Sequence, residues 1–341
     1  MTILSPTVSA TFGNLRYDSH VVSLQADLGM LPAVNMVTCG LPASTPVEAS
    51  VGDHAVVSLD GGDGAATLIT GTVGAISRRV DGTAVTTVDS GAALARLRPS
   101  ATFEAQGVTE IARALAGDAL ATVGRLDTSI RLAAYAAHQG MSAAEHVAAL
   151  GELGGLLAFV NDAGELEMIR RPLGLPDSAL LFGREFTTYE VDELTGPLGS
   201  PVPIGHGPAG FAPSPDGLIP TTEPLSGGAP DPGPDAVWNP APVLRTPEAV
   251  TVAATEASAS QAAETTRLRA TGWLLPVLRP GQLVEVQDLR DGLPVGPWLL
   301  TSVTHRLDPT GGGRTRIEAV VGGSALGSLL DAALGALGSL L

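Results

Sequence analysis

The feature that most constrains the fold is a strand–turn–strand pattern that occurs twice, far apart in the chain. The first copy, "LITGTVGAISRRVDGTAVTTV", occupies Leu68–Val88, and the second, "WLLTSVTHRLDPTGGGRTRIEAV", occupies Trp298–Val320. Each begins with an alternating apolar and polar segment, passes through turn residues and returns on a second alternating segment. Upstream of each copy, Gly52 or Gly281 opens another alternating strand. The pattern predicts one β unit used twice.

The region around the first copy reads as several short strands separated by turns. The Gly-rich run Asp60–Gly64 lies between two alternating segments, which is a hairpin signal. Short strands at such close spacing are typical of a small barrel or sandwich. We therefore expect two similar small β-barrels, one at each copy of the pattern.

The periodicity changes between the two copies. "VTEIARALAG" and "SAAEHVAALGELGGLL" have the spacing of amphipathic helices, and the second opens with a capping box formed by Ser142 and Glu145. A hairpin with its turn at Asn161–Gly164 follows. The prolines of residues 196–246 indicate an extended linker, and a further helix begins at Pro247.

These segments predict an α+β, mainly β protein in which two similar small β-barrels flank a mixed helix and hairpin domain. The predicted domains are a first β-barrel (1–99), a mixed α/β domain (100–185), a strand and Pro/Gly-rich linker (186–246), a helix with the second β-barrel (247–321), and a C-terminal apolar helix (322–341).

Charge and composition exclude some classes of function. The net charge of −16 argues against a nucleic-acid-binding surface, which needs a basic stripe. The single cysteine, Cys39, permits no internal disulfide. The first residues lack the pattern of a signal peptide, so synthesis in the bacterial cytoplasm is expected. No stretch is a convincing membrane span.

Two groups of histidines are candidates for a chemical site. His305 could act as a general base with Thr301 or Asp308 nearby, but it shares a strand face with Val303, which favours a packed structural histidine. His138 and His146 do not have the spacing of a zinc motif and are expected to be exposed residues at helix ends.

Two glycine-rich segments are candidates for a ligand site. Asp60–Gly64 lacks the ligands of a calcium loop, so a hairpin turn is favoured. Gly205–Gly210 matches G-x-G-x-x-G, but Pro208 and the prolines after it oppose the helix that a dinucleotide site requires. We expect no catalytic site, no metal and no cofactor.

Five segments together resemble a known family. "PGQLVEV" and "GPWLLTSVTHRLDPTGGGRTRIEAV" are similar to the last barrel of the phage late control protein D family, and "GTVGAISRRVDG" with "LARLRPSATFEAQGVTEIARALA" to its first barrel and exit. "MSAAEHVAALGELGGLLAFVNDAGELEMI" is similar to its middle domain. The order and spacing of these segments carry the resemblance. That family is the baseplate hub of contractile tails and the hub portion of VgrG spike proteins.

The resemblance implies a homotrimer that adapts a hexameric inner tube protein to a trimeric spike, beside other baseplate proteins, in a phage tail or a contractile injection particle. No segment after Val321 could form a spike, so the spike is expected to be a separate protein. A tail-tip peptidoglycan hydrolase and a host-binding β protein are the alternatives. Aromatic residues make up only 4% of the chain, which argues against the second.

The C-terminal segment "GGSALGSLLDAALGALGSLL" has apolar residues at alternating steps of four and three. Asp331 near its middle would cost about 2.5–3.5 kcal/mol in a bilayer, so a membrane span is disfavoured. We expect an amphipathic helix that binds the spike or a neighbouring hub chain, with docking on its own barrel left open. The residues expected to make that contact are Leu326, Leu329, Leu330, Leu334, Leu337, Leu340 and Leu341.

Overall fold

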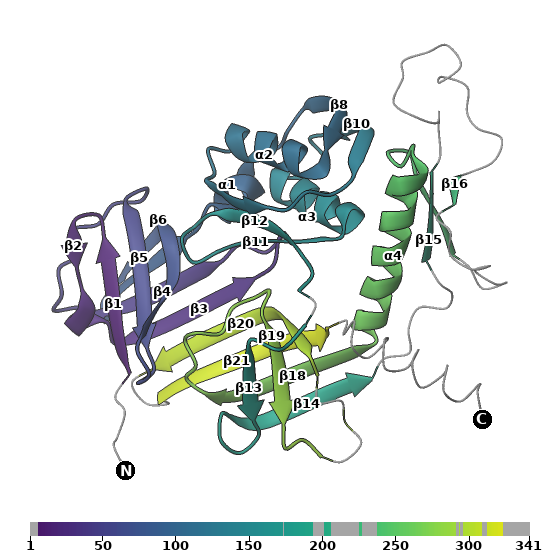
Figure 1. The fold of residues 1–341 in the computed structure, drawn as a ribbon. Helices are drawn as coiled ribbons and strands as arrows, with labels where there is room; N and C mark the ends of the chain where they lie inside the picture. The colour runs from purple at the N-terminus through teal and green to yellow at the C-terminus, as the bar shows by residue number, and fades with distance from the viewer. Residues whose placement is uncertain are drawn as a thin grey trace.

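The structure is a computed structural model of the 341-residue chain. It describes residues 6–172, 174–193, 201–205, 225–226, 237–290, 293, 296–308 and 312–322. The fold is mainly β with four α-helices among these residues, as the sequence predicts (Figure 1). The predicted C-terminal helix, with its seven leucines, lies outside the described residues.

The first unit consists of N-terminal strands and a short 3-10 helix. Its hairpin turn at Asp60 is confirmed: the carboxylate Oδ1 accepts hydrogen bonds from the backbone N–H groups of Gly62 at 2.7 Å and Gly64 at 3.1 Å. The elements are β1 (Thr7–Phe12), β2 (Leu15–Arg16), η1 (Asp18–His20), β3 (Ser23–Gly29), β4 (Met36–Pro42), β5 (His54–Asp60), β6 (Ala65–Arg79) and β7 (Gly82–Val88).

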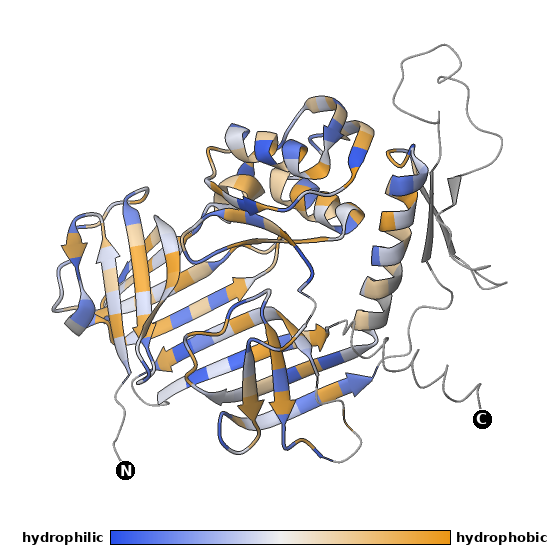
Figure 2. Ribbon diagram, viewed as in Figure 1, coloured by the Kyte–Doolittle hydropathy of each residue, from blue (hydrophilic) through white to orange (hydrophobic). Residues whose placement is uncertain are grey.

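The second unit repeats this arrangement with C-terminal strands. The strands lie in the order β5-β6-β7-β4-β3 in the first unit and β19-β20-β21-β18-β14 in the second. Its elements are β13 (Ser178–Leu181), β14 (Phe186–Glu193), β18 (Thr266–Trp273), β19 (Leu283–Gln287), β20 (Trp298–Asp308) and β21 (Gly312–Val321). Figure 2 shows the alternation of hydrophobic and hydrophilic residues along these strands.

The repeat extends to single backbone hydrogen bonds. Gly52 and Gly281 have φ angles of 95° and 89°, and each donates its N–H over 2.8 Å to a carbonyl, of Val73 in β6 and of Leu300 in β20. The residue after each of those carbonyls, Gly74 or Thr301, is the one at which the pairing with β7 or β21 shifts register. The predicted duplication is therefore confirmed at the level of the backbone.

The predicted pair of closed barrels is not confirmed. β3 of the first unit pairs antiparallel with β20 of the second, which joins both units in one 13-stranded sheet. Among the strands that the structure describes, no pairing closes either unit into a ring. An alternating strand can pair on either of its edges, and here the free edge of β3 is covered by the other unit.

The middle unit lies above both sets of strands in Figure 1. The capping box predicted at its third helix is confirmed, because the Ser142 N–H donates to the Glu145 carboxylate at 2.6 Å and the Glu145 N–H donates to Ser142 Oγ at 3.2 Å. Its elements are α1 (Gly91–Arg96), β8 (Ala101–Gly107), α2 (Val108–Asp118), β9 (Val123–Leu126), β10 (Arg131–Ala137), α3 (Ala143–Gly154), β11 (Leu156–Val160) and β12 (Leu166–Arg170).

The predicted linker contains strands. β15 (Pro201–Gly205) pairs with β16 (Leu225–Ser226) and with β17 (Val237–Ala241), while residues 206–210 of the glycine motif lie outside the described residues. The helix predicted at Pro247 is confirmed as α4 (Pro247–Glu264). Ala249, Val250 and Ala253 of α4 pack in the core of the middle unit, although the sequence groups this helix with the second barrel.

The predicted domain boundaries at residues 99, 185, 246 and 321 remain a prediction. No helix in the described part of the chain is long and apolar enough to cross a membrane.

Candidate functional site

The candidate functional site is the seam where the two units join. Six residue pairs, from Gly29 with Ser302 to Leu24 with Leu307, connect β3 and β20, which lie side by side in Figure 1. Both strands alternate, so the seam has one polar and one buried face. We describe the two faces in turn.

The polar face carries a cavity of about 310 Å³. Across the seam, Thr304 Oγ1 donates a hydrogen bond to Asp27 Oδ1 at 3.1 Å. The other Asp27 oxygen, Oδ2, accepts a hydrogen bond from Gln25 Nε2 at 2.9 Å. The lining residues are Gln25, Asp27, Ser302, Thr304, Arg316 and Glu318.

The opposite face of the seam is apolar except for His305, which is fully buried. Its Nδ1 lies 3.0 Å from Thr315 Oγ1, and that oxygen also accepts a hydrogen bond from the Leu275 N–H at 2.8 Å. Because the Thr315 hydroxyl can both donate and accept, it can bind Nδ1 in either neutral tautomer of the imidazole. Burial lowers the pKa of His305 to about 3, and the nearby Arg279 guanidinium lowers it further.

His305 is therefore the packed structural histidine that the sequence favours. A neutral imidazole out of contact with water does not reach a substrate, so it is not placed for general base work. Its other predicted companions do not join it: Thr301 Oγ1 donates to the Glu318 carbonyl at 3.1 Å, and Asp308 pairs with Arg306 at 3.2 Å.

Arg279, which lies near His305, connects the second unit to the first. Its guanidinium donates from Nη1 to the carbonyls of Pro276 at 2.5 Å and Leu278 at 2.8 Å, and from Nη2 to the carbonyl of Thr67 in β6. Burial lowers the pKa of Arg279, while Asp162 opposes that shift. This contact is invisible in the sequence, because Arg279 and Thr67 belong to segments with no local relationship.

The first unit also contacts the middle unit through buried polar groups. Asn35 Oδ1 accepts from the Gly29 N–H at 2.8 Å and Asn35 Nδ2 donates to the Val160 carbonyl at 3.1 Å. Next to it, Asp89 Oδ1 accepts from the Gly91 N–H at 2.9 Å, and burial raises the pKa of Asp89 to about 7. Sequence reasoning missed this cluster; the Asp89-Ser90 pair before a helix was the only available signal.

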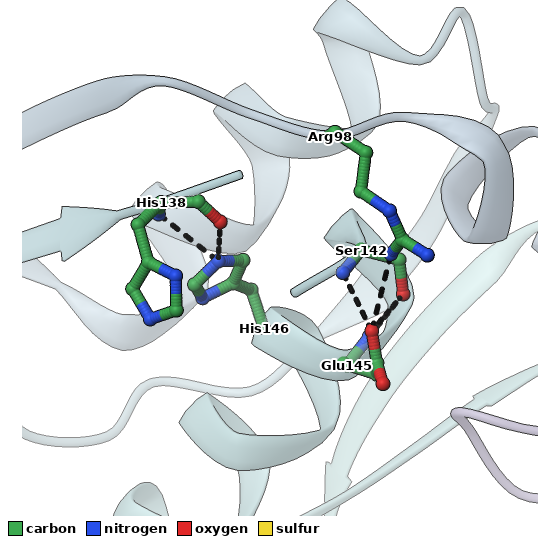
Figure 3. A network of polar contacts seen from close by, with 5 residues as sticks. All are labelled: Arg98, His138, Ser142, Glu145 and His146. Atoms are coloured by element: carbon green, nitrogen blue, oxygen red, sulfur yellow. Dashed lines mark hydrogen bonds and ion pairs between the residues drawn. The ribbon is translucent and has the colours of Figure 1, made fainter. Parts of the chain in front are cut away.

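The histidines of the middle unit do not form a metal site. His138 is exposed as predicted, but His146 is only 1% exposed, so the prediction of an exposed helix-end residue is wrong for it. The reason is tertiary: His146 Nδ1 lies 2.8 Å from the Tyr135 hydroxyl of β10. Figure 3 shows its second contact, in which Nε2 lies 3.0 Å from the His138 carbonyl. Glu145 instead caps α3 and pairs with Arg98 at 3.2 Å.

No cluster of histidine, cysteine, aspartate and glutamate side chains suited to a metal ion occurs among the residues that the structure describes. Several polar side chains at the seam and at the junction with the middle unit bind one another or backbone atoms, among them Asp27, Thr304 and Asn35. These contacts join the first unit to the second unit and to the middle unit.

No protein-family model matches the chain, and no curated protein matches it. Solved structures do. The 43 kDa tail protein of prophage MuSo2 from Shewanella oneidensis is 17% identical, with a TM-score of 0.68 over 93% of this chain and 98% of that one. The tail protein from Neisseria meningitidis is 15% identical, with a TM-score of 0.67 over 93% and 96%.

The E. coli c3393 protein is 14% identical, with a TM-score of 0.57 over 90% of this chain and 74% of that one. It is described as a component of the type VI secretion system with structural similarity to the bacteriophage T4 tail proteins gp27 and gp5. The chain thus has the fold of phage tail proteins over nearly its whole length, and the resemblance predicted from sequence is confirmed as to the fold.

Proposed function

We propose that this chain is the structural baseplate hub of a contractile phage tail or contractile injection system. In this function it is a homotrimer that adapts a hexameric inner tube protein to a separate trimeric spike protein, beside other baseplate proteins. The shared fold of tail proteins from Shewanella oneidensis and Neisseria meningitidis supports a tail component.

The observation that carries the adaptor function is the duplicated unit. Two strand sets with the same order, the same register shift and the same positive-φ glycine give each chain two similar surfaces. Three chains offer six such units to a sixfold ring and three whole chains to a threefold spike, which reconciles the two symmetries.

The proposed function is structural and includes no reaction. The seam between the units supports this assignment, because His305 is buried. The two carboxylates that line its cavity are also bound by neighbouring side chains: Asp27 by Thr304 and Gln25, and Glu318 by Arg316.

The test is to co-express the chain with the tube and spike proteins of the neighbouring reading frames. Native mass measurement should give three copies of the chain per particle, and negative-stain images should show a threefold ring. A monodisperse monomer in the presence of both partners would contradict the hub function. Clearing of peptidoglycan in a zymogram by the purified chain would contradict the structural assignment and favour a tail-tip hydrolase.

A further inference from the structure

We propose that β14 of one copy of this chain pairs with the outer edge of β6 in a second copy, antiparallel and in the register that β3 and β20 have within the chain. The inference rests on the proposed function in that both require several copies in one ring. It adds the residues that join the copies.

The first step is the equivalence of β6 and β20. Both strands shift register against their hairpin partner at one residue, Gly74 in β6 and Thr301 in β20. The segment after the shift is therefore equivalent in the two units, with Ala75 matching Ser302 and Ser77 matching Thr304. In β20 this segment pairs with β3.

The second step is the equivalence of β3 and β14. Each is the outermost strand on the far side of its unit, beyond β4 and β18 respectively. Asp27 lies opposite Met36 of β4, and Asp192 lies opposite Arg267 of β18. Met36 and Arg267 in turn pair with the corresponding valines of β7 and β21, so Asp192 is the counterpart of Asp27.

The third step is that β14, the counterpart of β3, and the end of β6, the counterpart of β20, each have an unpaired edge among the described strands. Along Thr188–Glu193, β14 pairs with β18 on one edge and with no other described strand. β5 pairs with β6 only as far as Thr72, so that Ala75–Arg79 pairs with β7 alone among the described strands. Exposed strand edges of this kind present a row of backbone donors and acceptors to another chain.

The fourth step is charge. β14 carries Glu190, Asp192 and Glu193, and the end of β6 carries Arg78 and Arg79. By equivalence with the seam, the opposed residues are Ile76 with Glu193, Ser77 with Asp192, Arg78 with Val191, and Arg79 with Glu190. Directly opposed residues of an antiparallel pair lie on the same face, where opposite charges attract.

This register also preserves the polar contact of the seam. Within the chain, Thr304 donates to Asp27, and between copies the hydroxyl of Ser77 faces the carboxylate of Asp192. Arg269 already binds Asp192 at 2.9 Å and Glu190 at 3.6 Å, so these two carboxylates of β14 accept an arginine within the chain. Arg79 of the second copy supplies another.

The partner is a second copy because the two edges belong to opposite ends of one sheet. β14 ends the sheet on one side, and β6 lies beyond β3, β4 and β7 on the other. The contact joins two different surfaces, head to tail, and such a contact generates a ring when its rotation closes. The same geometry joins first and second units within each chain.

Disulfide trapping tests the register. The double variant Ser77→Cys with Asp192→Cys should form disulfides between copies and give a ladder that ends at the closed ring on a non-reducing gel. The control is Ser77→Cys with Thr188→Cys, because Thr188 lies four residues, or about 13 Å, from the proposed position, beyond disulfide reach. Cys39 is buried and burial raises the pKa of its thiol to about 12, so it does not interfere.

Charge reversal gives a second measurement that needs no new cysteine. Arg79→Glu or Glu190→Arg alone should weaken association by about three- to tenfold, and the two together should restore it to within about twofold. Both side chains are exposed, and thermal unfolding of each variant shows that the fold is kept.

The outcomes separate this inference from the proposed function. A threefold ring in which the 77–192 disulfide does not form, or forms no better than the 77–188 control, overturns the edge pairing and leaves the hub function standing. A 77–192 disulfide in a particle without threefold symmetry supports the edge pairing and contradicts the hub function.

Discussion

The side-chain amide of Asn35 donates a hydrogen bond to the backbone carbonyl of Val160 at 3.1 Å and so joins the first unit to the middle unit. The same side chain accepts from the Gly29 N–H, and Asn35 is only 6% exposed. Both backbone groups depend on one residue at the junction between the units.

Replacing Asn35 by alanine should therefore destabilise the protein. The change leaves the partly buried Gly29 N–H and the buried Val160 carbonyl without this partner, and a buried group left unpaired costs about 1–3 kcal/mol, so a loss of about 2–4 kcal/mol is expected in urea unfolding. Gln25→Ala is the control, because Gln25 is exposed and its loss should cost about 0.5 kcal/mol or less. Equal midpoints for the two variants would contradict the assigned role of Asn35.

Asp89 should make the protein less stable as the pH rises from about 4 to about 7. Burial raises its pKa from 3.8 to about 7, so the folded form holds a proton that the unfolded form has released in this window. Its contribution is fully present below pH 4 and is lost above pH 7. Asp89→Asn should remove this part of the slope in unfolding measured at pH 4, 5.5 and 7.5, whereas Asp63→Asn, at an exposed turn residue, should leave it unchanged.

His305 should act in the opposite direction. Burial lowers its pKa from 6.5 to about 3. Below pH 6.5 the His305 imidazole is therefore protonated in the unfolded chain but stays neutral in the folded protein. Stability from this group is fully present above pH 6.5 and is lost as the pH falls towards 3. His305→Gln should cost about 1 kcal/mol at pH 7.5 and make unfolding less sensitive to acid. A variant that keeps the wild-type acid sensitivity would show that another group causes it.

Gly164 and Gly52 form a matched pair for backbone strain, with φ angles of 82° and 95°. A Cβ added at Gly164 would collide with the carbonyl oxygen of Thr70, whereas at Gly52 nothing lies within 4 Å. Gly52→Ala should cost about 1–2 kcal/mol, from the left-handed conformation alone. Gly164→Ala should cost clearly more in the same thermal unfolding assay, because the collision separates the middle unit from β6.

The C-terminal segment supports a prediction from sequence alone. The apolar face of this segment favours binding to the spike or to a neighbouring hub chain. Deletion of residues 324–341 should therefore leave a folded chain that no longer co-purifies with the spike. Circular dichroism of the truncated chain is the control for folding. Full-strength binding of the spike by that chain would rule out the docking role.

The repeated unit could be predicted from sequence because its signals are local. Gly52 and Gly281 each start a strand through their own positive φ, and the turn at Asp60 forms from hydrogen bonds to residues two and four positions away. In the middle unit, the capping box at Ser142 likewise joins residues three positions apart. The joining of β3 to β20 could not be predicted, because alternation determines which face of a strand is buried and not which strand covers its edge.

At the candidate site, too, local features could be predicted from the sequence and contacts between distant segments could not. His305 was correctly predicted as a packed residue, since it shares a face with Val303 within one strand. His146 was wrongly predicted as exposed, because Tyr135, its partner, comes from another strand. The burial of Asp89 and Arg279 was not predicted for the same reason, because nothing in the sequence around a single charged residue shows that it will be buried.

The seam also determines the order in which the protein can fold during synthesis. β3 leaves the ribosome near the beginning of translation, while the segment of β20 that covers it is made near the end. At about 5–20 residues per second, this leaves the β3 edge uncovered for on the order of 10–60 s. During that interval the chain presents an alternating apolar strand to any neighbouring nascent chain, so this edge is where co-translational mispairing should begin.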